Sequence, residues 1–144
     1  MENTDNFKSF ENLDVLKHCR ELRKKYEKLA KSLPTEEKYR LSDQLKRSSR
    51  STTQNIAEGY GRFYFQENIQ FCRISRGSLY ELLDHLITCL DNEYIKDKEL
   101  SSLRGDTITG IKLVNGYIRY LNYQKDGATT KSQKVNTVSQ VINQ

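Results

Sequence analysis

The segment of residues 44–59 constrains the fold of this chain most, because it has very few large apolar side chains yet lies between strongly amphipathic segments. Its small and polar side chains recur at steps of three and four, which places them on one face of a helix. That face comprises Leu41, Leu45, Ser48, Thr52, Asn55, Ile56 and Gly59. Such a face can be buried only if another helix comes unusually close. Because Ser75, Gly77 and Ser78 interrupt the apolar stripe of the next long segment, we expect that segment to be the partner, with Gly77 at the contact.

Long runs of three-four periodicity and a single proline, Pro34, predict an all-α chain with four helices. The expected helices span residues 12–32, 35–59 (or as far as Gly61), 65–90 and 97–123, with Thr35 as the N-cap of the second helix and a left-handed glycine at its end. Short connections favour antiparallel neighbours, hence an up-down-up-down four-helix bundle. We expect a flexible N-terminus (1–6), a bundle domain (7–123) and a polar, flexible C-terminal tail (124–144).

The predicted core begins with a stripe along the first helix, in the spacing of a bundle seam. It consists of Val15, Cys19, Leu22, Tyr26, Leu29 and Leu33. The cysteines are odd in number and lie on or beside apolar faces, which indicates buried thiols in a reducing cytoplasm rather than disulfides. No stretch has the roughly 18 to 20 apolar residues that a membrane helix needs, so we expect no membrane contact.

Basic residues are concentrated in the first helix and the start of the second. Residues 7–33 carry eight basic and four acidic side chains, whereas residues 63–95 carry two basic and five acidic ones. The first-helix cations lie about 200° from the core stripe, on the outward face. The predicted basic stripe consists of Lys17, Arg20, Lys24, Lys28 and Lys31, with Lys46, Arg47 and Arg50 from the second helix.

Two interpretations of the basic stripe are open at this point. It can follow a phosphate backbone of RNA or DNA, releasing counterions as each phosphate is neutralised. It can equally be the solvated face of a helix, partly neutralised by Glu21 and Glu27. The aromatic cluster Tyr60, Phe63, Tyr64 and Phe65 offers rings for base stacking, although covering the end of the bundle is the simpler role for most of it.

Several motifs in a fixed order resemble a known family. They are Phe10-x-x-Leu13, a turn at residues 34–39, Gln44-Leu45-x-Arg47, Asn55-Ile56-Ala57-Glu58-Gly59 and Gly77-Ser78-Leu79-x-Glu81-Leu82. In this combination the chain resembles the bacterial proteins encoded in 23S ribosomal RNA intervening sequences, the S23-type proteins, from residue 7 to 123. The accessory proteins of diversity-generating retroelements, which bind nucleic acid and a reverse transcriptase, are a distant branch. The resemblance implies a four-helix bundle that forms a homo-oligomer, specifically a homopentamer.

The motif residues Asn55, Glu58, Gly59, Gly77, Ser78 and Glu81 are interpreted as structural. We expect Asn55 to satisfy backbone groups near the glycine-rich helix end, and the two carboxylates to pair with arginines such as Arg47, Arg73 or Arg76. An acid-base or metal-binding carboxylate pair is the alternative, but no histidine or nucleophile at suitable spacing completes a site.

His85 and Cys89 lie four apart on one helix face, but zinc needs two further ligands and no Cys-x-x-Cys motif supplies them. No phosphate loop, dinucleotide fingerprint or nucleophile elbow occurs either. We therefore expect no catalytic residues, no metal and no cofactor. The sequence predicts a cytoplasmic, non-enzymatic protein that binds nucleic acid through the basic stripe. The alternative is a scaffold or accessory subunit that docks a partner protein without binding nucleic acid.

Overall fold

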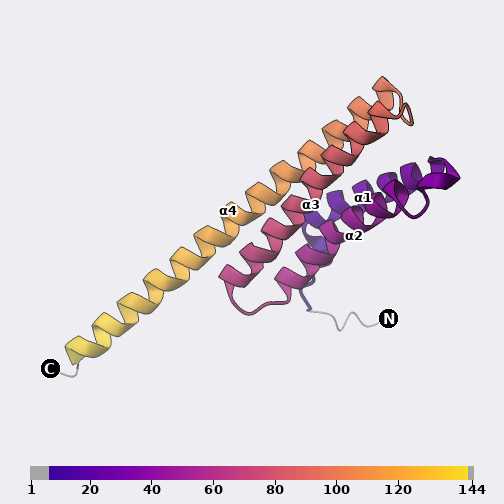
Figure 1. The fold of residues 1–144 in the computed structure, drawn as a ribbon. Coiled ribbons are helices and arrows are strands. Elements are labelled where there is room, and N and C mark those ends of the chain that lie inside the picture. The colour runs from indigo at the N-terminus through magenta and orange to yellow at the C-terminus, as the bar shows by residue number, and fades with distance from the viewer. Residues whose placement is uncertain (1–6, 143–144) are drawn as a thin grey trace, which may run out of the picture.

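The computed structural model describes residues 7–142 of the chain, with side chains described as far as residue 127. It contains four α-helices and two short 3-10 turns: η1 (Phe10–Asn12), α1 (Asp14–Ser32), η2 (Thr35–Glu37), α2 (Leu41–Tyr60), α3 (Phe65–Asp91) and α4 (Asp97–Ile142). Consecutive helices pack against each other, and α4 returns to α1 (Figure 1). The chain is therefore an all-α up-down bundle, as the sequence predicted.

The core is continuous along the bundle axis and follows the predicted apolar stripes. Every residue of the predicted α1 stripe is buried, and Tyr26 and Cys19 have no exposed surface. Tyr26 also makes a polar contact within the core, since its hydroxyl lies 2.6 Å from Thr107 Oγ1, which donates to the carbonyl of Leu103. All polar side-chain atoms buried in the described part of the chain have a hydrogen-bond partner. In that part no helix is long and apolar enough to cross a membrane.

The start of the second helix differs from the prediction. Thr35 begins the 3-10 turn η2, and α2 begins only at Leu41, after Arg40 leaves helical geometry with φ −123° and ψ −106°. The Glu37 carboxylate then accepts a hydrogen bond from the Leu41 amide at 3.1 Å. A carboxylate from the preceding turn therefore satisfies a free amide at the start of α2, the role that the sequence assigned to Thr35.

The end of the second helix is near the predicted position, but its geometry is different. Gly61 caps α2 with φ −74°, which is right-handed, and no glycine in the described residues has positive φ. The left-handed glycine cap was therefore a wrong prediction. In the described part of the chain, Glu93, between α3 and α4, is the one non-glycine residue with positive φ, at 59°.

The fourth helix is longer than predicted, because α4 continues past Tyr123 to Ile142 and runs beyond the turn between α2 and α3 (Figure 1). No proline follows Tyr123, and Gly127 alone costs only about 1 kcal/mol of helix propensity. Lys125 Nζ also donates to Gln66 Oε1 at 3.0 Å, which joins this part of α4 to the start of α3. The predicted division into a bundle domain and a tail stays a prediction, and residues 1–6 lie outside the described residues.

Candidate nucleic-acid interface and the contact between α2 and α3

Helices α2 and α3 meet along the small, polar face that the sequence singled out. Ser48 and Thr52 are buried there, and Ser75 Oγ donates to the Thr52 carbonyl at 2.8 Å. Ser78 Oγ donates to Ser51 Oγ at 2.7 Å. Short hydroxyl side chains therefore link α3 to α2, which requires the close approach predicted from the small side chains.

The glycine at this close approach is Gly59 and not Gly77. A Cβ atom at Gly59 would lie 2.6 Å from Asn68 Oδ1, 2.9 Å from Phe71 Cβ and 3.0 Å from the Asn68 carbonyl oxygen. At Gly77 the same atom would meet nothing within 4 Å, and the residue is exposed. The predicted contact of the Ser48-Thr52-Asn55 face with Gly77 was therefore wrong, because the serines on either side of this glycine turn toward α2 while the glycine itself turns outward.

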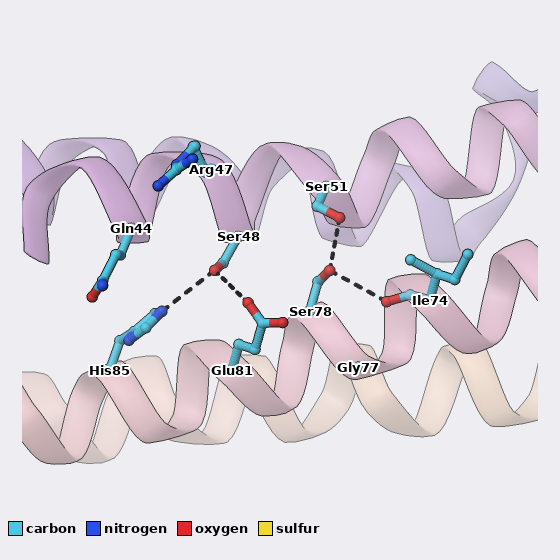
Figure 2. Close-up of a pocket in the computed structure, with 9 residues that line it drawn as sticks. All are labelled: Gln44, Arg47, Ser48, Ser51, Ile74, Gly77, Ser78, Glu81 and His85. Atoms are coloured by element: carbon cyan, nitrogen blue, oxygen red, sulfur yellow. Dashed lines mark hydrogen bonds between the residues drawn. The ribbon is translucent and has the colours of Figure 1, made fainter.

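A polar cleft of about 540 Å³ opens between α2 and α3 on the side of Gly77 (Figure 2). Ser48 lies between two α3 side chains, with its Oγ donating to Glu81 Oε2 at 3.0 Å and lying 3.4 Å from His85 Nε2. Ser48 of α2 is therefore joined to two polar side chains of α3.

Of the two motif carboxylates, Glu58 pairs with an arginine, as expected, although this is Arg62 and none of the three that were named. Glu58 pairs at 2.8 Å with Arg62, which lies just after the end of α2. Glu81 accepts from Ser48, as described above, and Arg76 donates to Asn115 Oδ1 at 2.8 Å instead of pairing with a carboxylate. Arg47 pairs with Asp43 at 3.1 Å.

The other motif polar residue, Asn55, is half-buried and bonds within its own helix. Its amide donates to the Ser51 carbonyl at 2.8 Å and to Ser51 Oγ at 2.9 Å, so it supports the preceding turn of α2 and not the glycine-rich end. It thereby fixes the Ser51 hydroxyl that receives the hydrogen bond from Ser78. The Asn-Ile-Ala-Glu-Gly and Gly-Ser-Leu-x-Glu-Leu motifs thus meet across the contact between α2 and α3.

A basic groove with a volume of about 740 Å³ runs between α1 and α2. We use the name basic groove for this surface, whose charged lining consists of Lys17, Arg20, Arg23, Arg50 and Glu11. Arg50 pairs with Glu27 at 2.9 Å, whereas neither Lys17 nor Arg20 has an ion pair among the described residues. The groove therefore keeps a net positive charge after its internal pairing.

Arg23 is the residue of this groove that sequence reasoning missed. It is half-buried, and its Nη1 donates to Thr53 Oγ1 at 3.1 Å, which fixes the guanidinium between the two helices. A guanidinium has five N–H donors, so four remain for a ligand. Arg23 was not included in the basic stripe because it lies closer to the core stripe than the outward cations do. It lines the groove only because α2 packs beside α1.

The structure distributes the eight predicted cations over several surfaces. Lys17, Arg20 and Arg50 share the basic groove, whereas Lys28 lines a second groove between α1 and α4 and Arg47 lines the cleft between α2 and α3. Lys24 and Lys31 are exposed on α1, and Lys46 is half-buried on α2. Lys24 pairs with Glu21 at 3.0 Å, with more than half of each side chain exposed, so water screens the pair.

Two residues of the aromatic cluster, Phe63 and Tyr64, do not cover the end of the bundle as predicted. Phe63 is 89% exposed and Tyr64 is 65% exposed, and their rings meet edge to face at 5.0 Å. Tyr60 instead packs on Phe10 at 6.4 Å and donates to the carbonyl of Lys8. The turn between α2 and α3 therefore presents two aromatic rings to solvent.

The three cysteines are free and buried, as the sequence indicated. Burial raises the pKa of Cys19 to about 12 and those of Cys72 and Cys89 to about 11. His85 points to the cleft, while Cys89 has no exposed surface. In the described residues, no group of three or more histidine, cysteine, aspartate or glutamate side chains could hold a metal ion.

Comparison with known proteins identifies the family of this fold. Residues 11–116 match the model of the 23S rRNA-intervening sequence protein family. A crystal structure of a protein of unknown function from the S23 ribosomal protein family of Bacteroides thetaiotaomicron is similar, with 25% identity and a TM-score of 0.68. The similarity covers 73% of this chain and 95% of that one, and no curated protein matches. The chain belongs to the family of 23S rRNA-intervening sequence proteins.

Proposed function

We propose that this protein is a non-enzymatic nucleic-acid-binding protein that contacts the phosphate backbone of RNA or DNA. The observation that carries the proposal is the basic groove, in which cations from α1 and α2 converge. Arg23 is held in place by Thr53, so little side-chain entropy is lost when it meets a phosphate. Lys17 and Arg20 are exposed and free of ion pairs in the described part of the chain, and supply further charge.

Backbone binding of this kind has a defined salt dependence. Each phosphate that the protein neutralises contributes about −0.9 to the slope of log affinity against log salt on B-DNA and about −0.7 on a single strand. The groove supports several such contacts, so binding weakens steeply between 50 and 300 mM salt. Sequence preference is weak, because phosphate contacts carry no base information.

The test is fluorescence anisotropy with labelled oligonucleotides, comparing the native chain with Lys17→Glu/Arg20→Glu. We expect at least a tenfold loss of affinity at 50 mM salt and a smaller salt slope. The matched control is Arg104→Glu/Lys112→Glu, which makes the same change in net charge at exposed positions of α4 and should bind more tightly than the groove variant. Equal affinity of the two variants would overturn the basic groove as the binding surface.

We further propose that the protein assembles with copies of itself, in the five-fold form that the family resemblance implies. Two large apolar side chains exposed on one face of α3 support this, namely Tyr80 and Ile87. The same surface would dock a partner protein if the chain is a scaffold. Light-scattering mass measures the assembly, and Tyr80→Glu/Ile87→Glu should reduce it. A monomeric native protein would contradict self-assembly.

A further inference from the structure

A second, smaller hollow lies next to the basic groove along α2. The basic groove shares Gln54 and Ala57 with this hollow, which is lined further by Glu58, Gly61 and Arg62. The two hollows therefore adjoin along α2, and we call them together the path from the arginines toward the turn between α2 and α3. From Arg50 to Ala57 this path covers about 10 Å at the helical rise of 1.5 Å per residue.

Two exposed aromatic residues, Phe63 and Tyr64, directly follow Arg62 of the second hollow in the chain. Phe63 has the highest exposed fraction of any large apolar side chain in the described part of the chain. Arg62 separates the rings from the hollow, and its guanidinium is fixed by Glu58 at 2.8 Å and by the ring of Phe71 at 4.9 Å. This pairing neutralises Glu58 on the path and anchors the base of the aromatic turn.

Exposing an aromatic pair to water is unfavourable, and these rings cover none of the core. Rings beside a cationic groove are the usual platform for unpaired bases, whose flat faces stack on them while the groove follows the backbone. Paired bases are stacked inside a duplex and cannot reach such rings. The two rings meet edge to face, with an interplanar angle of 87°, and both side chains are mostly exposed.

We propose that the protein recognises single-stranded nucleic acid, with the backbone in the basic groove and unpaired bases stacked on Phe63 and Tyr64. This inference rests on the proposed function and adds the class of substrate. Stacking contributes about 1–3 kcal/mol per base, so loss of one stacked base corresponds to roughly a 5- to 150-fold loss of affinity.

The experiment compares a single-stranded oligonucleotide with a blunt duplex of the same sequence, using Phe63→Ala/Tyr64→Ala. The variant should lose at least tenfold in single-strand affinity and little in duplex affinity, with an unchanged salt slope because no cation is removed. The matched control is Tyr39→Ala, which removes an aromatic ring that is 84% exposed at the opposite end of α2 and should bind as the native chain does.

A direct reporter is available because the chain contains no tryptophan. In Phe63→Trp the single indole should be quenched by the single strand and not by the duplex. Absence of quenching, together with native-like binding by the alanine variant, would overturn the stacking while leaving the groove intact. If neither oligonucleotide binds the native protein, the proposed function itself fails, and the inference fails with it.

Discussion

Replacing Gly59 by alanine should destabilise the protein, although alanine is the better helix former. The added Cβ would lie 2.6 Å from Asn68 Oδ1, 2.9 Å from Phe71 Cβ and 3.0 Å from the Asn68 carbonyl oxygen. The Asn68 amide cannot turn away freely, since it donates to the Tyr117 hydroxyl at 3.2 Å and accepts from Cys72 Sγ at 3.5 Å. The backbone oxygen can move only if α3 moves away from α2.

The size of the effect follows from two opposing contributions. Overpacking of a tight contact costs about 1–3 kcal/mol. Exchanging glycine for alanine recovers at most about 1 kcal/mol of helix propensity, and less near the end of a helix. We therefore expect a net loss of about 1–2 kcal/mol, which lowers the melting temperature by about 3–8 °C for a chain of this size.

Thermal unfolding followed by far-UV circular dichroism measures this loss, with Gly77→Ala as the control. Gly77 is also inside a helix, but a Cβ there would meet nothing within 4 Å. The control should gain about 0.5–1 kcal/mol and melt about 2–4 °C higher. If both variants become more stable, the close contact at Gly59 is not a constraint on the fold and the reasoning is refuted.

Three further predictions concern the core. Tyr26→Phe removes the hydroxyl that lies 2.6 Å from Thr107 Oγ1 and should lower the free energy of unfolding by about 1 kcal/mol in urea titration, whereas an unchanged value would mean that the bond adds no net stability. Ser75→Ala removes the bond to the Thr52 carbonyl and should cost about 0.5–1.5 kcal/mol by the same assay, with no cost counting against a role in holding α2 to α3. The pKa of Cys19 is raised to about 12, against 9.0 for a free thiol. The resulting contribution to stability is fully present below pH 9 and is lost as pH rises toward 12. Urea titrations between about pH 8 and 10.5 should therefore show a falling free energy of unfolding, and a flat profile would contradict this.

Several features of the candidate site could be read from the sequence, and others could not. The spacing of Lys17 and Arg20 on the outward face of α1 was visible, because helical periodicity places side chains without knowledge of their neighbours. Arg23 was missed because its role depends on Thr53, which lies thirty residues away in the chain. The sequence also could not show that Arg47 lines the cleft between α2 and α3 while Arg50 lines the basic groove. This depends on which neighbouring helix each side of α2 faces.

The sequence by itself determined the all-α class, the four helices, the core stripe of α1 and the small polar face of α2, because these follow from the periodicity of side chains along one helix. Only the tertiary structure decided which glycine lies at the contact between α2 and α3. The sequence placed both Gly59 and Gly77 at this contact, yet Gly59 meets Asn68 whereas Gly77 is exposed. The reason is geometric, since the rotation of one helix against another fixes each contact and depends on the packing of the whole bundle.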